Sequence, residues 1–373
     1  MPKTSKPMTS STATFVLCLA LLLLFLSNSD ACISEMKRGL SLCAGVLVPT
    51  LFPYMIISEM LVRADLGYYL GKLLERPMRR VFGISGSGAG ALALGIVCGF
   101  PIGAKTAATL YEKSELSRRE CEKLYSFCNY PSAPFVTFAV GKRLLGSTAL
   151  GLFIYAVNIA TGLLFGLLSA DKKSSILPLC ELEKPRDTKS VFKIFTDSVA
   201  SAAGAVISVC ALVTFFTCAV GCISAFDCIR SAPVIKAVIF SFFELTSGVA
   251  ACATLPSRFL AAILTAAAVG WSGMSVLMQI YSAYDGKDTV PSLVPYVKSR
   301  LISSVVCAAL TAIAVTVFPT LLPAQIPDED AFLNLSAIPE AFAYVANTLF
   351  IISIPFSFND SHSLLISSTS QKL

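Results

Sequence analysis

The stretch Gly99-Phe-Pro-Ile-Gly-Ala-Lys105 places a proline, two glycines and a lysine within sequence that otherwise reads as membrane-spanning. Unpaired backbone groups cost several kcal/mol in lipid, so helix-breaking residues persist at membrane depth only inside protein or beside a water-filled cavity. A weaker counterpart, Glu244-Leu-Thr-Ser-Gly248, lies in the second half of the chain. Broken segments at corresponding positions of two halves indicate the binding site of a transporter. The two stretches therefore predict a membrane transporter.

The composition is that of a polytopic membrane protein. Of the 373 residues, 55% are hydrophobic and 14% are charged, whereas about 25% of residues are charged in a soluble domain. The net charge of +6 comes from lysines and arginines in short segments between apolar runs, which is a signal of membrane topology. We therefore expect contact with the lipid bilayer and no nucleic-acid partner.

Apolar runs predict an all-α fold with about eight to ten membrane elements, because a spanning helix needs about 20 apolar residues. Full-length runs cover residues 43–62, 146–168, 200–221 and 301–322. Shorter or interrupted runs cover residues 86–103, 127–141, 234–255, 259–281 and 342–356. We expect some of the shorter runs to be broken or re-entrant helices.

A polar segment divides the chain into two halves with similar elements in the same order. We expect an N-terminal membrane anchor helix (1–30), a first half (31–168), a polar linker (169–190), a second half (191–322) and a C-terminal segment with a last membrane helix (323–373). An inverted repeat and a coincidence among apolar runs both explain this order, and we favour the repeat. For the first apolar run we favour an uncleaved helix over a cleaved signal peptide.

The densest basic loop indicates the orientation in the membrane. Arg63 to Arg80 contains five lysines and arginines, and the positive-inside rule places this loop in the cytoplasm. The N-terminus is then inside and residues 28–38 are outside. Beyond Gly83 the orientation depends on whether residues 86–103 cross the membrane or turn back, and both options stay open.

The first break supplies candidate anion-binding groups. Pro101 suits a first helical turn because its φ is fixed and it lacks an N–H. With Gly99 and Gly103 beside it, it predicts a helix start whose free N–H groups, with the ammonium of Lys105, bind an anion within the membrane. The alternative is a packed kink with Lys105 reaching the interface.

A second break follows a charged helix expected over residues 114–127 at the membrane surface. Ser117-Arg-Arg-Glu120 is a capping box that opens this helix, and its charges are interpreted as a solvated face. Pro131 cannot supply an N–H, so the helix stops there and frees Asn129 and Ser132 to offer polar groups to a ligand.

Glu244 interrupts an apolar run in the second half, and a carboxylate at that depth indicates a functional residue. We expect it to be a proton or cation partner, or the counter-ion of Lys105. Glu59 is less informative because it can reach the headgroups. The other candidate binding residues are small or polar residues in the second-half breaks: Thr246, Ser247, Gly248, Ser272, Ser275 and Gln279. Trp271, beside them, also suits an interfacial anchor.

The thirteen cysteines lie mostly within apolar runs, where thiols behave as small hydrophobes. Cys218 and Cys222 share a helix face, but no CxxC pair exists and His362 is the only histidine. We therefore expect no metal site and no cofactor. A catalytic nucleophile, base and orienting group cannot be assembled, so we expect no enzymatic activity.

Four motifs in order resemble the sporulation integral membrane protein YlbJ (SpoVV) group within the nucleoside-transporter/FeoB Gate-domain superfamily. They are Gly99–Lys105, Phe127-Cys-Asn-Tyr-Pro-Ser132, Glu244–Gly248 and Gly273-Met-Ser-Val-Leu-Met-Gln279, and the resemblance covers residues 36–320. It implies Gate-like halves whose hairpins meet at a central site. It also implies import of dipicolinate, a small anionic solute, across the outer forespore membrane. Ile102 and Trp271 depart from the family pattern and reshape the cavity that the resemblance implies.

Two other functions stay open. A non-transporting scaffold for spore-envelope assembly would use the broken helices for packing or docking, and it would tolerate the loss of Lys105 and Glu244. A nucleoside-type carrier is the third reading, although no aromatic-rich polar pocket argues for a base. A homo-oligomer is compatible with all three functions.

Overall fold

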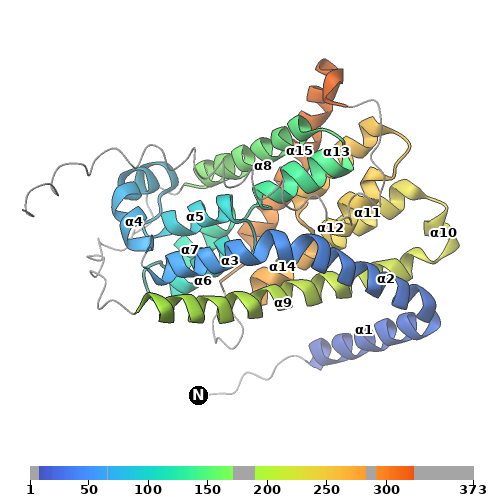
Figure 1. Ribbon diagram of the computed structural model, residues 1–373, viewed down its shortest axis with the longest axis horizontal. Helices are drawn as coiled ribbons and strands as arrows, with labels where there is room; N and C mark the ends of the chain where they lie inside the picture. The colour runs from blue at the N-terminus through green and yellow to red at the C-terminus, as the bar shows by residue number, and fades with distance from the viewer. Residues whose placement is uncertain (1–7, 65, 171–189, 283–290, 323–373) are drawn as a thin grey trace, which may run out of the picture. The chain divides into compact units, whose positions relative to one another are not determined.

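The computed structural model describes residues 8–64, 66–170, 190–282 and 291–322. All regular elements in these ranges are helices, which confirms the predicted all-α fold (Figure 1). Among the described residues, five helical stretches are long and apolar enough to cross a bilayer: Ser29–Arg63, Thr148–Leu168, Val191–Ser224, Arg258–Ser282 and Val294–Val317. They confirm the prediction of a polytopic membrane protein. The apolar run 342–356 lies outside the described residues.

The first half is a series of helices with two breaks. Its elements are α1 (Met8–Ser27), α2 (Ser29–Leu42), the π-helical η1 (Cys43–Leu47), α3 (Val48–Arg63), α4 (Leu66–Pro77), the π-helical η2 (Met78–Phe82), α5 (Gly88–Val97), α6 (Ile102–Glu112), α7 (Arg118–Tyr125), the π-helical η3 (Phe135–Leu144) and α8 (Thr148–Leu168). The breaks separate α5 from α6 and α7 from η3, at the two motifs that the sequence singled out.

The second half follows the same order. It contains α9 (Val191–Ser224), α10 (Asp227–Arg230), α11 (Pro233–Phe243), α12 (Leu245–Ala253), α13 (Arg258–Trp271), α14 (Gly273–Ser282), α15 (Val294–Val317) and the 3-10 turn η4 (Pro319–Leu321). Its breaks fall at Glu244, between α11 and α12, and at Ser272, between α13 and α14. The internal repeat itself stays a prediction.

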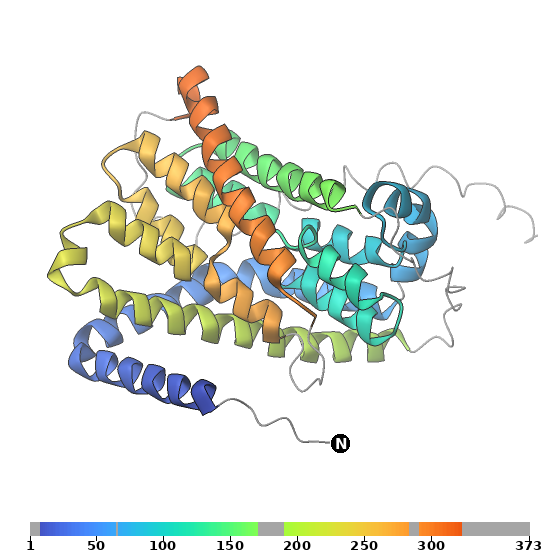
Figure 2. The ribbon, with the colours of Figure 1, turned by 180° about the vertical axis from the view of Figure 1, so that it is seen from behind.

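The two halves pack into each other. The long helix α9 lies against α2 and α3, running in the opposite direction (Figures 1 and 2). One buried apolar cluster combines η3 and α8 with α12, α13 and α15, and a second combines α5, α6 and α7 with α14. Each cluster therefore draws on elements from both halves, and this packing brings the breaks toward one another.

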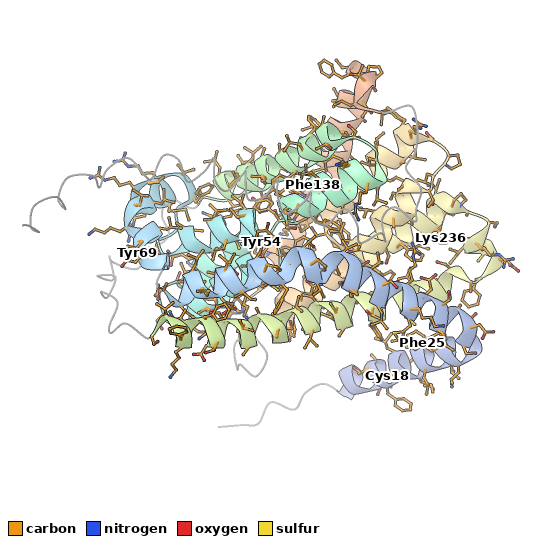
Figure 3. All side chains as sticks on the ribbon, viewed as in Figure 1. Cys18, Phe25, Tyr54, Tyr69, Phe138 and Lys236 are labelled. Carbon is orange, nitrogen blue, oxygen red and sulfur yellow. The ribbon has the colours of Figure 1, made fainter. Side chains whose placement is uncertain are left out.

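Large apolar side chains cover the outer helices. On α1, Phe15 is 68% exposed and Leu26 is 67% exposed, and Figure 3 shows side chains such as Cys18 and Phe25 projecting from this helix. Such surfaces are unfavourable in water and favourable in lipid. The bilayer contact expected from the composition is consistent with this arrangement.

The predicted capping box at α7 is confirmed. The Ser117 hydroxyl accepts a hydrogen bond from the Glu120 N–H (3.3 Å), and the Glu120 carboxylate accepts one from the Ser117 N–H (2.9 Å). The interpretation of all α7 charges as a solvated face is wrong for Glu120. Its carboxylate is buried and also accepts from the Ser85 N–H at 2.8 Å, so it ties the loop before α5 to α7.

The predicted orientation can be tested on α4. Arg76 is exposed on this helix, so Arg76→Cys should react with a membrane-impermeant thiol reagent only after the cells are opened. Asp30→Cys, exposed near the start of α2, should react in intact cells, because residues 28–38 are expected outside. Labelling is measured against the unsubstituted chain, and fast reaction of Arg76→Cys in intact cells would reverse the orientation.

Candidate functional site

The two breaks of the first half touch each other. The Phe100 N–H donates to the Tyr130 carbonyl at 2.7 Å. Gly99 has φ +84° and lies so close to Ser132 that a Cβ would collide with the Ser132 backbone. The requirement for glycine at position 99 is therefore both conformational and steric. As predicted, α6 starts directly after Pro101.

The two breaks of the second half meet in the same way. Gly273 has φ +86°, and a Cβ there would lie 3.0 Å from the Leu245 N and 3.3 Å from the Glu244 Cα. Gly248 packs on the Ser241 backbone with no room for a Cβ. Each half thus forms a pair of interrupted helices held together at a left-handed glycine.

A cavity of about 30 Å³ lies where the two pairs of breaks meet. The first half contributes Phe100 and Ser132, and the second contributes Glu244, Thr246 and Gln279. The remaining lining residues are Leu47, Thr50, Leu51, Phe135, Val209, Val213, Leu245 and Val276. Four predicted site residues from both halves, Ser132, Glu244, Thr246 and Gln279, therefore line one space.

Glu244 is both the N-cap of α12 and a wall of this cavity. Only 2% of it is exposed, and its two carboxylate oxygens accept from the N–H groups of Thr246 (2.9 Å) and Ser247 (2.6 Å). The Ser247 hydroxyl is in turn 2.9 Å from the Thr217 hydroxyl on α9. The start of α12 is already occupied by a carboxylate, which satisfies its N-terminal donors.

Three predicted residues carry buried polar groups at the break edges. The Asn129 side-chain amide donates to the Tyr125 carbonyl at 3.3 Å, but its Oδ1 has no partner, and neither has the Ser132 hydroxyl. Gln279 donates to the Ser275 hydroxyl at 3.2 Å. A buried group without a partner loses its solvation, so the Ser132 hydroxyl, which lines the cavity, is available to a ligand, whereas Asn129 is fully buried and does not line this cavity.

The last predicted residues have structural contacts. Ser272 has φ +77° and its hydroxyl donates to the Val269 carbonyl at 3.3 Å. Trp271 donates to the Phe242 carbonyl at 2.9 Å and stacks on the Phe242 ring, with 5.6 Å between centroids. The Trp271 ring therefore packs on α11, directly before the break at Ser272.

Lys105 lies apart from this cavity. Its Nζ is 2.5 Å from the Glu59 carboxylate and 2.9 Å from the Ser201 hydroxyl. Arg63 adds contacts to Glu59 (3.7 Å) and to Asp197 (3.9 Å). The structure thus contradicts the expected pairing of Lys105 with Glu244. Glu59, which was expected to contact the headgroups, is instead the ion-pair partner of Lys105. A second cavity of about 20 Å³, lined by Pro101, Lys105 and Glu59, adjoins this ionic network.

The ionic network predicts that substitutions of Lys105 and Glu59 lower the folding stability, an effect that can be measured without substrate. Lys105→Met leaves Glu59 without its ammonium, and we expect a loss of about 1 kcal/mol, or roughly 1 °C in melting temperature for a chain of 373 residues. Glu59→Gln combined with Lys105→Met should recover part of that loss, because neither charge is then unpaired. Melting curves in detergent measure this cycle. Strictly additive single losses would show that the two side chains do not interact.

Sequence reasoning missed Arg300, which is fully buried on α15. Its Nη1 donates to the Asn158 Oδ1 at 3.2 Å, and its guanidinium lies 5.4 Å from the Tyr130 ring centroid and 5.9 Å from that of Tyr296. Its Nε and Nη2 have no hydrogen-bond partner. Within the described part of the chain, no carboxylate pairs with it. In the sequence, Arg300 stands directly before the apolar run 301–322, and nothing at that position marks it as a site residue.

The comparisons with known proteins agree with the motifs. No family model and no solved structure matches the chain. Among curated proteins, it is 36% identical over 142 residues to the sporulation integral membrane protein YlbJ of Bacillus subtilis (strain 168). The match covers 37% of this chain and 35% of YlbJ, so the aligned part is about a third of the length of that relative.

The match bears on the resemblance and on the location of the protein. It confirms the resemblance to the YlbJ group that four motifs predicted, while the place of this group in the Gate-domain superfamily stays a prediction. Five apolar helices of spanning length support the same location. The chain is a multi-pass membrane protein that resembles the YlbJ group.

Proposed function

We propose that the chain acts in sporulation as a membrane carrier for a small organic anion. Dipicolinate, the solute that the resemblance implies, is the first substrate to test, and the outer forespore membrane is the first location. The relative's name supports the link to sporulation. The observation that carries the proposal of transport is the cavity lined jointly by the broken helices of both halves.

The cavity belongs to a closed state of such a carrier. At about 30 Å³, it has room for about two waters and is too small for an aromatic ring with two carboxylates. Substrate entry therefore requires the broken helices of the two halves to separate. The short helices α5, α6, α11 and α12 end at these breaks, so they can move without unwinding a full-length span.

The charges support an anion as the solute. Arg300 is a buried cation that no carboxylate pairs with in the part of the chain that the structure describes, and burying an unpaired charge is costly unless the charge has a use. It stacks against Tyr130, whose carbonyl accepts from Phe100 at the cavity edge. A substrate carboxylate near this segment would supply the missing negative charge. Glu244 opposes anion binding unless it is protonated, which favours proton-coupled entry.

The proposal is tested in two steps. Spore dipicolinate content is first measured in a strain that lacks this chain, with and without the chain supplied, and normal content without it contradicts a role in dipicolinate import. Uptake of labelled dipicolinate into vesicles that contain the purified chain is then compared with uptake into empty vesicles. Low dipicolinate in spores combined with no uptake in vesicles would favour the envelope scaffold.

A further inference from the structure

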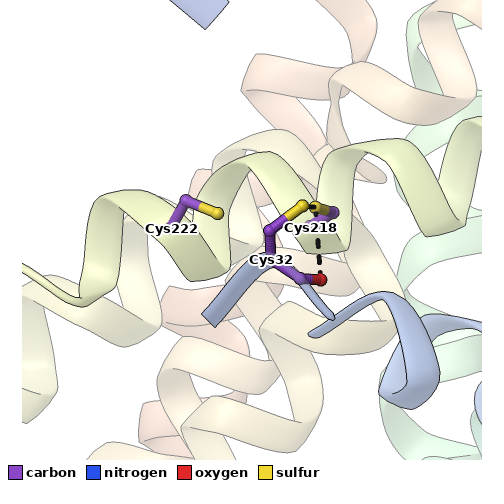
Figure 4. A group of neighbouring side chains, drawn as sticks. All are labelled: Cys32, Cys218 and Cys222. Carbon is purple, nitrogen blue, oxygen red and sulfur yellow. Dashed lines mark hydrogen bonds between the residues drawn. The ribbon is translucent and has the colours of Figure 1, made fainter. Parts of the chain in front are cut away.

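Three cysteine thiols converge at one end of the α2–α9 pair. Cys32 comes from α2, and Cys218 and Cys222 lie one turn apart on α9 (Figure 4). Their three sulfur atoms lie within 4.8 Å of one another, and the Sγ atoms of Cys32 and Cys218 are 3.0 Å apart. The sequence places Cys218 and Cys222 on one face, but only the packing of α2 on α9 adds Cys32.

This arrangement differs from that of the other buried thiols. The Cys43 Sγ, at the start of η1, contacts the Cys210 carbonyl and the Thr214 hydroxyl, each at 3.6 Å, and it has a single thiol, that of Cys210, beside it rather than two. Cys307 packs within an apolar cluster. A thiol that acts as a small hydrophobe needs no second thiol beside it. Three sulfurs that face each other make the set of soft ligands that Zn²⁺ prefers.

A carboxylate borders the three thiols. Glu35 lies one turn after Cys32 on α2, and its side chain fills the space in front of Gly221, where any Cβ would collide with the Glu35 Cγ. Its Oε2 is buried and accepts no hydrogen bond, although the Arg38 Nη1 is 3.7 Å away. The Glu35 carboxylate is not within 4.8 Å of all three sulfurs, so a rotation of its side chain on α2 is needed to bring an oxygen ligand to the cluster.

We propose that Cys32, Cys218 and Cys222 bind one Zn²⁺ ion, with the Glu35 carboxylate as the fourth ligand. Tetrahedral zinc with Zn–S bonds of about 2.3 Å separates its sulfur ligands by about 3.8 Å. The separations in the cluster, from 3.0 Å for one pair up to a limit of 4.8 Å, bracket this value, so small side-chain rotations are sufficient. Each thiol releases one proton as its thiolate binds, and Arg38 offsets part of the negative charge. A disulfide would use only two of the three sulfurs.

The position of the cluster gives the ion a structural role beside the candidate site. Thr217, next to Cys218, contacts Ser247 at the start of α12 at 2.9 Å. Zinc that joins α2 to α9 would fix α9 at this contact. The cluster lies at the start of α2, which the positive-inside rule places on the outer side of the membrane.

The test measures zinc in the full-length chain, purified under reducing conditions in detergent. We expect about one zinc per chain by elemental analysis, and at least a tenfold lower content in Cys218→Ser and in Cys32→Ser. Cys43→Ser, which removes a buried thiol at the start of η1, should keep its zinc. Co²⁺ added to the metal-free chain should give a thiolate charge-transfer absorption that Cys218→Ser lacks.

Two further results decide the proposal if the serine variants fail to accumulate. Zinc should protect Cys32, Cys218 and Cys222 of the unsubstituted chain from alkylation, and a chelator should remove this protection. Equal alkylation with and without zinc would overturn the proposal. A disulfide would show itself in the zinc-free protein as linked peptides containing Cys32 and Cys218, with a mass lower by two hydrogen atoms. If such protein also fails to take up zinc after reduction, the two thiols form a disulfide instead of a zinc site.

Discussion

Arg300→Gln is expected to abolish dipicolinate uptake while the protein still accumulates in the membrane. Among the described residues, the Nε and Nη2 groups of Arg300 have no hydrogen-bond partner, and in the proposed carrier they bind a substrate carboxylate once the broken helices separate. A hydrogen bond to a charged group contributes about 1.5–3 kcal/mol, and the loss of one such bond weakens binding by about 10- to 100-fold. Arg300→Gln removes both the positive charge and the guanidinium that can bind a carboxylate through two N–H groups. Uptake into vesicles and equilibrium binding of labelled dipicolinate measure the effect.

Two further variants separate binding from structure. Lys298→Gln removes a positive charge from an exposed position two residues away on α15 and should leave uptake unchanged. Arg300→Lys keeps the charge but loses the planar fork, so partial uptake is expected. Unchanged uptake in Arg300→Gln would instead make Arg300 a brace for the Tyr130 and Tyr296 rings, and the anion site would have to lie elsewhere.

The breaks were predictable because they depend on local chemistry. A glycine followed by a proline in an apolar run, such as Gly99 and Pro101, indicates a helix end and a helix start from the local sequence alone. The capping box at Ser117 is equally local. The structure places α6 and α7 accordingly. The spans followed from length and apolarity alone. These features need no knowledge of which helices pack together.

The side-chain partners were not predictable, because they depend on packing between distant helices. Lys105 is 46 residues from Glu59 in sequence, and Glu244 was the more conspicuous acid, yet α3 rather than α11 lies beside α6. Cys32 meets Cys218 only because α2 packs along α9. Arg300 borders an apolar run in the sequence, whereas in the structure it is buried against Asn158 of α8 and the Tyr130 ring. A single sequence without pairing information does not contain these contacts.

Glu244→Gln is expected to reduce uptake by at least about 100-fold, through two effects that the structure separates. Glutamine keeps one acceptor oxygen but turns an NH₂ group toward the Thr246 or Ser247 N–H, so one cap bond is lost at about 0.5–2 kcal/mol. It also removes the group that would carry a proton into the cavity beside Ser132 and Gln279. Uptake as a function of pH, with melting temperature measured in parallel, distinguishes the two contributions.

Two matched variants assign the loss to the charge or to the cap. Ser257→Ala removes the exposed cap of α13, where the hydroxyl accepts from the Leu260 N–H at 3.3 Å, so it should cost similar stability and leave uptake intact. Glu244→Asp keeps an ionisable carboxylate that caps helices well but withdraws it from the cavity by one methylene, and it should retain stability with reduced, still pH-dependent uptake. If Glu244→Gln transports normally at every pH, then Glu244 serves α12 only as a cap. In that case the cavity between the halves contains no proton-carrying group among the residues that line it, and proton coupling is ruled out at this site.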